Sequence, residues 1–259
     1  MKFLCLSDTI DPLVYSEAIK ERFADVDAVL CAGDLPMEYI DFVVSMLNVP
    51  VYFVFGNHNL KEFPYYHKSF QTEELFEEHN SKKKEPFSGC GAVYAGFKVH
   101  RLKVAEKKTL LIAGSSGSIW YNGGMAQYSD RRMFLILLGM APSLLYNKIR
   151  YGRFLDVFLT HSPPYKIHDK EDPCHTGFKC FRWFLKQFQP ACMIHGHIHL
   201  YDFLAKRVSV YHKTKIINVY SHYVADVDIP QSQFLHMEEM SPYESEKSKE
   251  RETSEDTNG

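Results

Sequence analysis

The chain has 259 residues, of which 45% are hydrophobic and 24% charged, so it can bury a large core and is not disordered as a whole. Its 30 basic and 32 acidic residues give a net charge of −2, but residues 238–259 hold 8 acids against 3 bases. The remaining 27 bases and 24 acids in residues 1–237 form too small an excess to favour nucleic-acid binding. We expect one domain over residues 1–237 and a disordered acidic tail over 238–259.

Short apolar segments that end in polar residues recur along the chain, and amphipathic stretches separate several of them. The segments predict buried strands at residues 2–8, 27–34, 50–58, 109–117, 156–164 and 191–199. The stretches predict three helices, one capped by Ser16, one over 40–47 ended by Pro50, and one over 178–188 ended by Pro190. Residues 208–214 and 215–221 indicate paired antiparallel strands. This alternation predicts an α/β protein with buried sheets.

The longest apolar stretch, residues 133–146, is shorter than the roughly 18 residues of a membrane span and is interrupted by Gly139 and Pro142. Two short buried helices that meet at Pro142 explain it, and contact with a membrane surface is the alternative. The surrounding segment, residues 119–153, is the best candidate for a helical insertion that caps the site and selects the substrate. Its aromatic residues fit a core equally well.

The N-terminal residues contain only a four-residue apolar run after Lys2, so we expect neither a signal peptide nor stable membrane insertion. The six cysteines include no CxxC pair, which favours reduced thiols in a cytoplasmic protein. Cys5 and Cys31 lie within apolar segments and are expected in the core.

Residues of metal-ligand types lie at the polar ends of these segments. Because the carboxyl ends of strands in α/β sheets meet in one crevice, side chains far apart in sequence can converge there. Gly33, Gly56 and Gly196 precede three of these groups, and a missing Cβ lets the backbone turn close to an ion. The mixture of carboxylate, imidazole and amide donors suits Mn, Fe, Zn, Ni or Co. The candidates are Asp8, Asp34, Asn57, His58, His161, His197 and His199.

This ordered set resembles the calcineurin-like metallophosphoesterase superfamily over residues 1 to about 225. The resemblance implies a two-sheet β sandwich flanked by helices, a four-layer αββα fold with two divalent metal ions at the sheet edges. Carried over by position, one ion is held by Asp8, Asp34 and His199, and the other by Asp34, Asn57, His161 and His197, with Asp34 bridging the two.

The resemblance also implies a metal-dependent phosphoric ester hydrolase, in which a hydroxide shared by the two ions attacks phosphorus without a protein nucleophile. His58 is then the catalytic residue outside the coordination shell, where it contacts the substrate and acts as general acid. We expect a small phosphorylated substrate, a diester rather than a monoester, because no dedicated basic cluster for a dianion is visible. The weak excess of bases disfavours a nuclease, and the oligomeric state stays open.

The sequence departs from the family pattern at the first motif, where Ile10 replaces the usual histidine and leaves one ion a ligand short. Asp11 could substitute for it, although a residue that begins the turn before Pro12 is the simpler interpretation. Asn59 stands where an acidic residue commonly follows the histidine. The alternative function is therefore a catalytically weak or inactive protein-binding scaffold, as in the retromer subunit that shares this fold.

Three further features have two interpretations each. His175 lies in a loop before the last predicted helix, where it could bind substrate phosphate or only cap the helix. Gly114, Ser115 and Ser116 end a strand, and we expect them to be packing or turn residues rather than part of the site. The lysines at 82–84 are expected to form a solvated loop, with steering of anions as the alternative.

Overall fold

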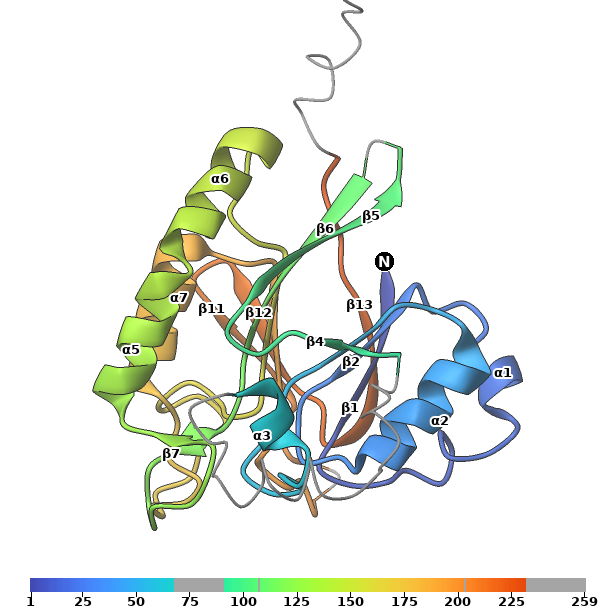
Figure 1. The fold of residues 1–259 in the computed structure, drawn as a ribbon, viewed down its shortest axis with the longest axis horizontal. Helices are drawn as coiled ribbons and strands as arrows, with labels where there is room; N and C mark the ends of the chain where they lie inside the picture. The colour runs from blue at the N-terminus through green and yellow to red at the C-terminus, as the bar shows by residue number, and fades with distance from the viewer. Residues whose placement is uncertain (68–90, 107, 203, 232–259) are drawn as a thin grey trace, which may run out of the picture.

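The computed structural model describes residues 1–67, 91–106, 108–202 and 204–231 of the chain. Two mixed β-sheets lie face to face, and helices cover their outer sides (Figure 1). The predicted acidic tail at 238–259 and the lysines at 82–84 fall outside the described residues. The predicted fold, a two-sheet sandwich flanked by helices in four layers, is confirmed.

Each sheet has a parallel centre and at least one antiparallel edge. In the five-stranded sheet, β1 to β4 are parallel and β13 runs antiparallel to β1. Its order is β13 (Ser221–Asp226), β1 (Lys2–Ser7), β2 (Ala28–Cys31), β3 (Val51–Phe53) and β4 (Val93–Tyr94).

The six-stranded sheet has four parallel strands between two antiparallel edges. Its order is β11 (Val208–Tyr211), β12 (Thr214–Asn218), β10 (Cys192–His195), β9 (Val157–Thr160), β6 (Lys108–Ser115) and β5 (Val99–Ala105). A separate parallel pair is formed by β7 (Ser118–Ile119) and β8 (Gln127–Tyr128).

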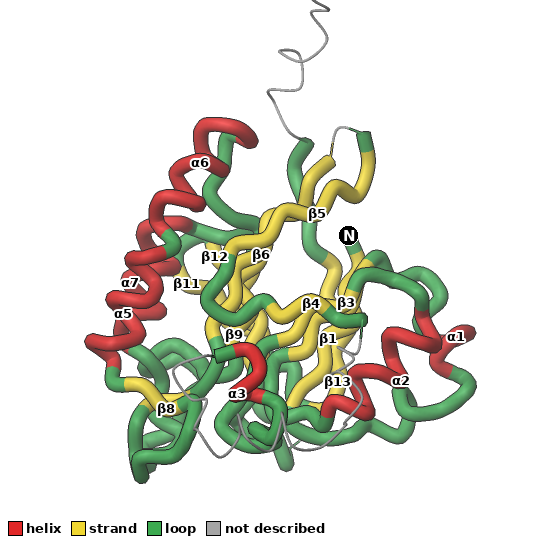
Figure 2. Tube along the Cα trace, in the orientation of Figure 1, coloured by secondary structure: helices red, strands yellow, loops and turns green. Residues whose placement is uncertain are grey.

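The helices form two groups on opposite sides of the sandwich (Figure 2). Beside the five-stranded sheet lie α1 (Ile19–Arg22) and α2 (Met37–Leu47). Beside the six-stranded sheet lie α5 (Asp130–Gly139), α6 (Ala141–Tyr151) and α7 (Lys179–Phe188). The short α3 (Phe63–Tyr66) follows β3.

The predicted strands and the antiparallel pair near residue 214 are confirmed, and α2 and α7 end where Pro50 and Pro190 predict. The prediction that Ser16 caps the first helix is wrong, because the helix begins only at Ile19 with Ala18 at its N-cap and Ser16 Oγ donates to the Leu13 carbonyl instead. The sequence patterns missed β5 and β13, whose residues alternate only weakly between buried and exposed positions.

Alternate residues of each strand enter two different layers. In β1, Phe3 and Cys5 pack between the sheets with residues of the six-stranded sheet, whereas Leu4 and Leu6 face the helices. Both sets have no exposed surface, and Cys5 and Cys31 lie in the core as predicted. This double burial explains why the strands are apolar on both faces.

The helices α5 and α6 meet near Pro142, as predicted, but they are not buried all round. Met133, Leu137 and Leu144 are fully buried, while the side facing away from the sheet exposes several large apolar residues. The prediction of two buried helices is therefore wrong for that side. None of the described helices combines the length and apolar character needed to cross a bilayer.

The helical layer is attached to the six-stranded sheet mainly through aromatic packing. Phe158 in β9 stacks on Phe184 with ring centroids 4.4 Å apart and meets the edge of Phe181 at 5.3 Å. All three side chains are buried. Aromatic pairs of this kind add to the stabilisation from area burial alone.

Replacing Phe158 with Ala should lower the free energy of unfolding by about 3–5 kcal/mol, because it leaves a cavity between β9 and α7. Denaturant titration followed by circular dichroism measures the loss. Val210→Ala is the matched control, since Val210 in β11 is 71% exposed, and it should change stability by no more than about 0.5 kcal/mol. Equal effects of the two variants would contradict this account of the interface.

Candidate metal centre

The carboxyl ends of the parallel strands in both sheets bring the predicted site residues to one edge of the sandwich. Asp8, Asp34 and Asn57 follow β1, β2 and β3 of one sheet, and His161 and His197 follow β9 and β10 of the other. One ligand atom each from Asp8, Asp34 and His161 lies within 4.8 Å of the others. Segments up to 189 residues apart thus meet, since Asp8 accepts a hydrogen bond from His197 N–H.

Three of these residues adopt backbone conformations that are costly for residues with a Cβ. The φ angles of Asp8, Asp34 and His197 are 68°, 57° and 67°. Left-handed conformations outside glycine cost on the order of 1–3 kcal/mol and occur mainly where surrounding structure enforces them. The chain therefore turns sharply just after β1, β2 and β10, which directs these side chains toward one another.

Two glycines allow the close approach that the sequence predicts. A Cβ on Gly196 would lie 2.6 Å from Asp8 Oδ2, and one on Gly56 would collide with the Asp34 carboxylate. A side chain at either position would displace a site residue. Glycine is therefore required at these two positions because a Cβ would clash with neighbouring atoms, and not because the backbone adopts a left-handed conformation there.

Three polar atoms surround His161 Nε2. Asp34 Oδ2 lies 3.3 Å away, Asn57 Oδ1 3.1 Å and His197 Nδ1 3.0 Å. Asp34, His161 and His197 are at most 7% exposed. Carboxylate, amide and imidazole atoms therefore converge on one buried point.

The second nitrogen of each histidine ring decides which tautomer is present. His161 Nδ1 lies 2.9 Å from the carbonyl oxygen of Ala32, and His197 Nε2 lies 2.7 Å from that of Cys174. Because a carbonyl oxygen can only accept a hydrogen bond, the Nδ1–H of His161 and the Nε2–H of His197 donate to these carbonyls. In the neutral rings His161 Nε2 and His197 Nδ1 then face each other with lone pairs, an arrangement that calls for a cation or an extra proton.

The charges of the site agree with this requirement. Burial by itself raises the pKa of Asp34, but the charge and hydrogen bond of His161, together with those of His58, outweigh it and lower the pKa to about 2. Burial by itself lowers the pKa of His161, yet Asp34 and then Asp8 raise it to about 9. Burial, followed by His161, lowers the pKa of His197 to about 3. The two carboxylates thus stabilise positive charge beside His161 Nε2, and the donor set fits a divalent cation.

The second predicted ligand set is more open. Asp8, whose side chain is 1% exposed, lies 3.8 Å from Nε2 of His199, which is 40% exposed. Burial raises the pKa of Asp8, and Ser7 Oγ donates a hydrogen bond of 2.6 Å to its carboxylate. Ile10 is 43% exposed and offers no ligand atom.

Asp11 does not take the place of the missing histidine. Its carboxylate accepts hydrogen bonds from Ser221 Oγ and His222 Nδ1 at 2.5 Å each, and from Leu13 N–H at 2.8 Å. Asp11 therefore holds the turn after β1 against β13. The simpler interpretation from sequence, a turn residue, agrees with these contacts.

His58 lies beside the cluster without entering it. Its backbone N–H donates to Asp34 Oδ1 at 2.7 Å, and its side chain is exposed. Asn59, the departure from the family pattern, donates from Nδ2 to the backbone carbonyl of Asp34 at 2.8 Å. Both residues therefore hold the Asp34 turn in place.

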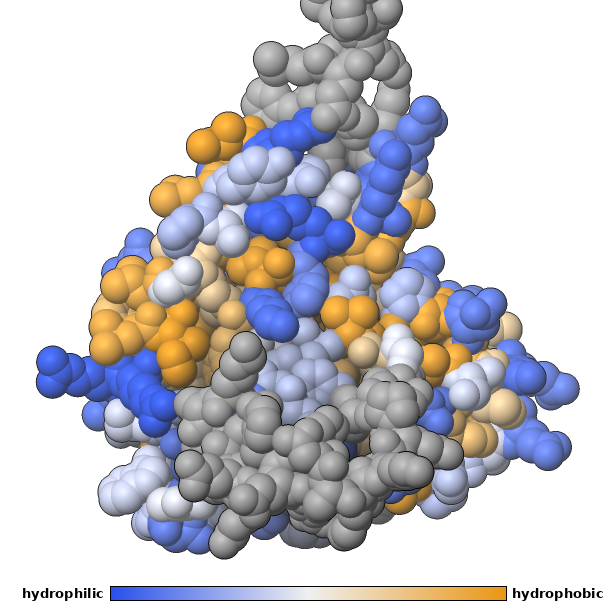
Figure 3. All heavy atoms as spheres, in the orientation of Figure 1, coloured by the Kyte–Doolittle hydropathy of each residue, from blue (hydrophilic) through white to orange (hydrophobic). Residues whose placement is uncertain are grey.

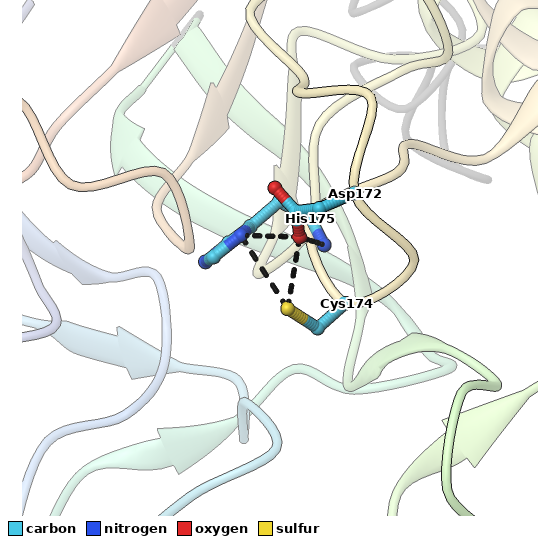
Figure 4. A group of neighbouring side chains, drawn as sticks. All are labelled: Asp172, Cys174 and His175. Atoms are coloured by element: carbon cyan, nitrogen blue, oxygen red, sulfur yellow. Dashed lines mark hydrogen bonds and ion pairs between the residues drawn. The ribbon is translucent and has the colours of Figure 1, made fainter.

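The loop before α7 contributes contacts that sequence reasoning missed. Asp172 Oδ1 accepts hydrogen bonds from Cys174 Sγ at 2.9 Å and from His175 Nδ1 at 2.7 Å (Figure 4). The hydrogen bond from Cys174, together with those from His175, lowers the pKa of Asp172 to about 2. The same turn presents the Cys174 carbonyl to His197, so it fixes the tautomer of a site histidine. Sequence motifs consist of side chains, so they give no indication that the Cys174 backbone carbonyl would be an acceptor at the site.

The remaining predicted residues separate into site and packing residues. His175 lies beside the site, with its ring centroid 5.3 Å from that of His197. Tyr121, from segment 119–153, reaches the site and accepts a hydrogen bond of 3.3 Å from Asn57 Nδ2. Ser115 and Ser116 instead bond to Met133 and Tyr94 in the core. The packing role predicted for the two serines agrees with these contacts.

Comparison with known proteins identifies the family. The family model described as calcineurin-like phosphoesterase matches residues 1–201. The chain belongs to this family. TT1561 of Thermus thermophilus, a solved structure, shares 11% identity with it over 89% of this chain and 98% of that chain, with a TM-score of 0.56.

A second similar solved structure is a single mutant of Vps29 from Entamoeba histolytica, with 13% identity over 85% of this chain and 74% of that chain and a TM-score of 0.32. No curated protein matches the chain. The likeness to TT1561 shows a shared fold and nothing about the substrate.

The Asp34–His161 pair should make stability of the metal-free protein depend on pH. Because the pKa of His161 is raised from 6.5 to about 9 in the folded state, its contribution is fully present below pH 6.5 and is lost as pH rises through 9. The lowered pKa of Asp34 gives a contribution that is present above pH 3.8 and is lost as pH falls through 2.

Urea unfolding of chelator-treated protein across pH 6.5 to 9 measures this loss. The difference in unfolding free energy between the wild type and His161→Gln should shrink over this range. A difference that stays constant would show that the two groups are not coupled as the geometry indicates.

Proposed function

We propose that this calcineurin-like phosphoesterase is a dinuclear metal-dependent hydrolase of phosphate diesters. The observation that carries the proposal is the convergence of Asp34, Asn57 and His197 acceptor atoms on His161 Nε2, with both ring N–H groups already used on carbonyls. A buried group of acceptors needs a positive charge at its centre.

Two overlapping ligand sets would hold the ions. Asp34, Asn57, His161 and His197 form the buried set, and Asp8, Asp34 and His199 form the more exposed set. Two divalent ions held there would acidify a water molecule and neutralise phosphoryl oxygens during in-line attack. The imidazole and carboxylate donors suit manganese, iron or zinc, and manganese is the ion for a first assay.

The chain's own groups orient the reactants. His58 N–H donates to Asp34 Oδ1 while Oδ2 lies near His161, and the Asp34 carboxylate would be the group shared by the two ligand sets. The exposed His58 imidazole would protonate the leaving oxygen as general acid, a role typically worth 10²- to 10⁴-fold. His175, whose ring lies beside His197, would contact the substrate phosphate.

The preference for diesters follows from charge. In the described part of the chain, the groups that contact the ligand sets are imidazoles, carboxylates, hydroxyls, amides and backbone atoms, with no lysine or arginine among them. A singly charged diester requires less neutralisation than a dianionic monoester. A small diester is therefore the better substrate class.

The alternative function is a protein-binding scaffold with a weak or absent second ion. Ile10 and the exposed position of His199 favour it, since both weaken the second ligand set. The buried set and His58 favour chemistry.

Replacing His58 with Ala should lower turnover of bis-para-nitrophenyl phosphate in manganese by about 10²- to 10⁴-fold and leave the bound metal unchanged. Asp34→Asn should lose both metal and turnover, because Asp34 belongs to both ligand sets. His212→Ala is the control, since His212 is exposed in the turn between β11 and β12.

Metal analysis of protein purified without chelator accompanies the assay. Wild-type protein that carries neither metal nor activity would support the scaffold instead. Full activity of His58→Ala would remove the general-acid assignment and leave the metal centre untouched.

Replacing Ile10 with His should strengthen the exposed ligand set, because it supplies an imidazole two residues after Asp8. We expect a gain in affinity for the more weakly held ion on the order of 10-fold, equivalent to about 1.4 kcal/mol. Isothermal titration of chelator-treated protein with manganese measures both binding steps. Ile10→Gln, which removes the apolar side chain without adding an imidazole, is the control and should leave the weaker step unchanged.

A further inference from the structure

An apolar surface covers the outer side of α5 and α6. Leu135, Leu138, Leu145 and Ile149 are 59%, 45%, 54% and 76% exposed, and Tyr146 is 52% exposed. We call these five residues the outer face. Scattered single apolar residues are normal on a protein surface, but a group on adjoining helices marks an interaction site.

Helical spacing places the outer face on one side. The buried residues Met133, Leu137 and Leu144 repeat at helical intervals and pack toward the six-stranded sheet. The outer-face residues fall on the opposite side of the same turns. The helices α5 and α6 follow one another nearly end to end (Figure 1), and apolar side chains gather over them along one edge of the molecule (Figure 3).

Positive charge surrounds this apolar surface. Residues 130–153 contain five basic residues and one acid, Asp130, which accepts a hydrogen bond from Cys180 N–H. Arg153 is paired with the buried Asp156, so four of the five basic residues contribute to the surface charge. The adjacent α7 adds Lys179, Arg182 and Lys186 and has no acid. The helical layer is thus strongly basic in a chain whose net charge is −2.

We propose that the outer face of α5 and α6 docks on the surface of an anionic lipid bilayer. Apolar side chains that lie in the plane of the headgroups, flanked by arginine and lysine, are the features that hold an interfacial helix. Arg131 and Arg132 at the start of α5 are exposed and would contact lipid phosphates. The attachment is peripheral, since the two helices have 10 and 11 residues.

Charge also distinguishes the bilayer from other occupants. A second copy docked through this face would bring two basic layers together, which opposes association. A nucleic acid would match the charge but leave the leucines and Ile149 without apolar partners. An anionic bilayer satisfies both the apolar and the basic residues.

Co-sedimentation of the full chain with vesicles tests the proposal. The wild type should bind vesicles of phosphatidylcholine with phosphatidylglycerol and should bind pure phosphatidylcholine weakly, and salt should reduce the difference. One basic residue near an anionic surface contributes roughly a factor of five, so Arg131→Ala/Arg132→Ala should weaken binding about 30-fold. Leu138→Ser/Ile149→Ser should weaken it on the order of 10-fold or more.

Matched controls lie on the opposite side of the molecule. Lys20→Ala/Arg22→Ala in α1 removes two exposed basic residues, and Val224→Ser removes an exposed apolar residue from β13. Neither control should change vesicle binding. Circular dichroism and thermal unfolding verify that each variant is folded.

Three outcomes would overturn the proposal. The first is absence of wild-type binding to the anionic vesicles. The second is equal loss in the controls and the outer-face variants. The third is a dimer of the wild type in sedimentation velocity that Leu138→Ser/Ile149→Ser dissociates, because this would assign the face to a second copy.

Discussion

The site depends on the positive charge that buried acceptor atoms demand beside His161 Nε2. Asp34 and Asn57 present oxygens to this nitrogen, and His197 presents a lone pair, because the Ala32 and Cys174 carbonyls take the remaining ring N–H groups. Without a cation or proton these groups repel one another in a medium of low dielectric. The two backbone carbonyls, which have no chemical role of their own, thus decide what the site can bind.

The sandwich supplies the rigidity that such a site requires. Left-handed backbone at Asp8, Asp34 and His197 costs free energy, and each of these residues follows a buried strand. The core between the sheets joins β1 and β2 to β9 and β10, so ligands from the two halves of the chain keep a fixed separation. Burial in the core therefore compensates for strain at the sheet edge.

Much of this arrangement could be predicted from the sequence, since double-sided burial leaves continuous apolar strands and close packing leaves Gly56 and Gly196. The Cys174 carbonyl could not be predicted, because any residue offers a carbonyl and only the Asp172 turn directs this one. The contact of Asp11 with Ser221 and His222 depends on the pairing of β13, which has a weak strand pattern. The exposed side of α5 and α6 was missed for a different reason. A helix with apolar residues on all sides is normally buried on all sides, so the sequence pattern alone predicts burial and does not reveal a side that the rest of the chain leaves uncovered.

The two proposed ligand sets differ in a way that bears on the choice between enzyme and scaffold. Three members of the buried set, Asp34, His161 and His197, are at most 7% exposed, whereas the other set depends on His199, which is 40% exposed and also bonded to Tyr201. An ion in the first set would be held by four side chains, and an ion in the second would share Asp34 and exchange more readily with solvent. A scaffold needs neither ion for catalysis, and an ion in the first set would then serve only as a structural cross-link between the sheets. The proposed dinuclear esterase would need both, so its activity would follow the occupancy of the second set, and the two functions would differ in metal dependence although they share one fold.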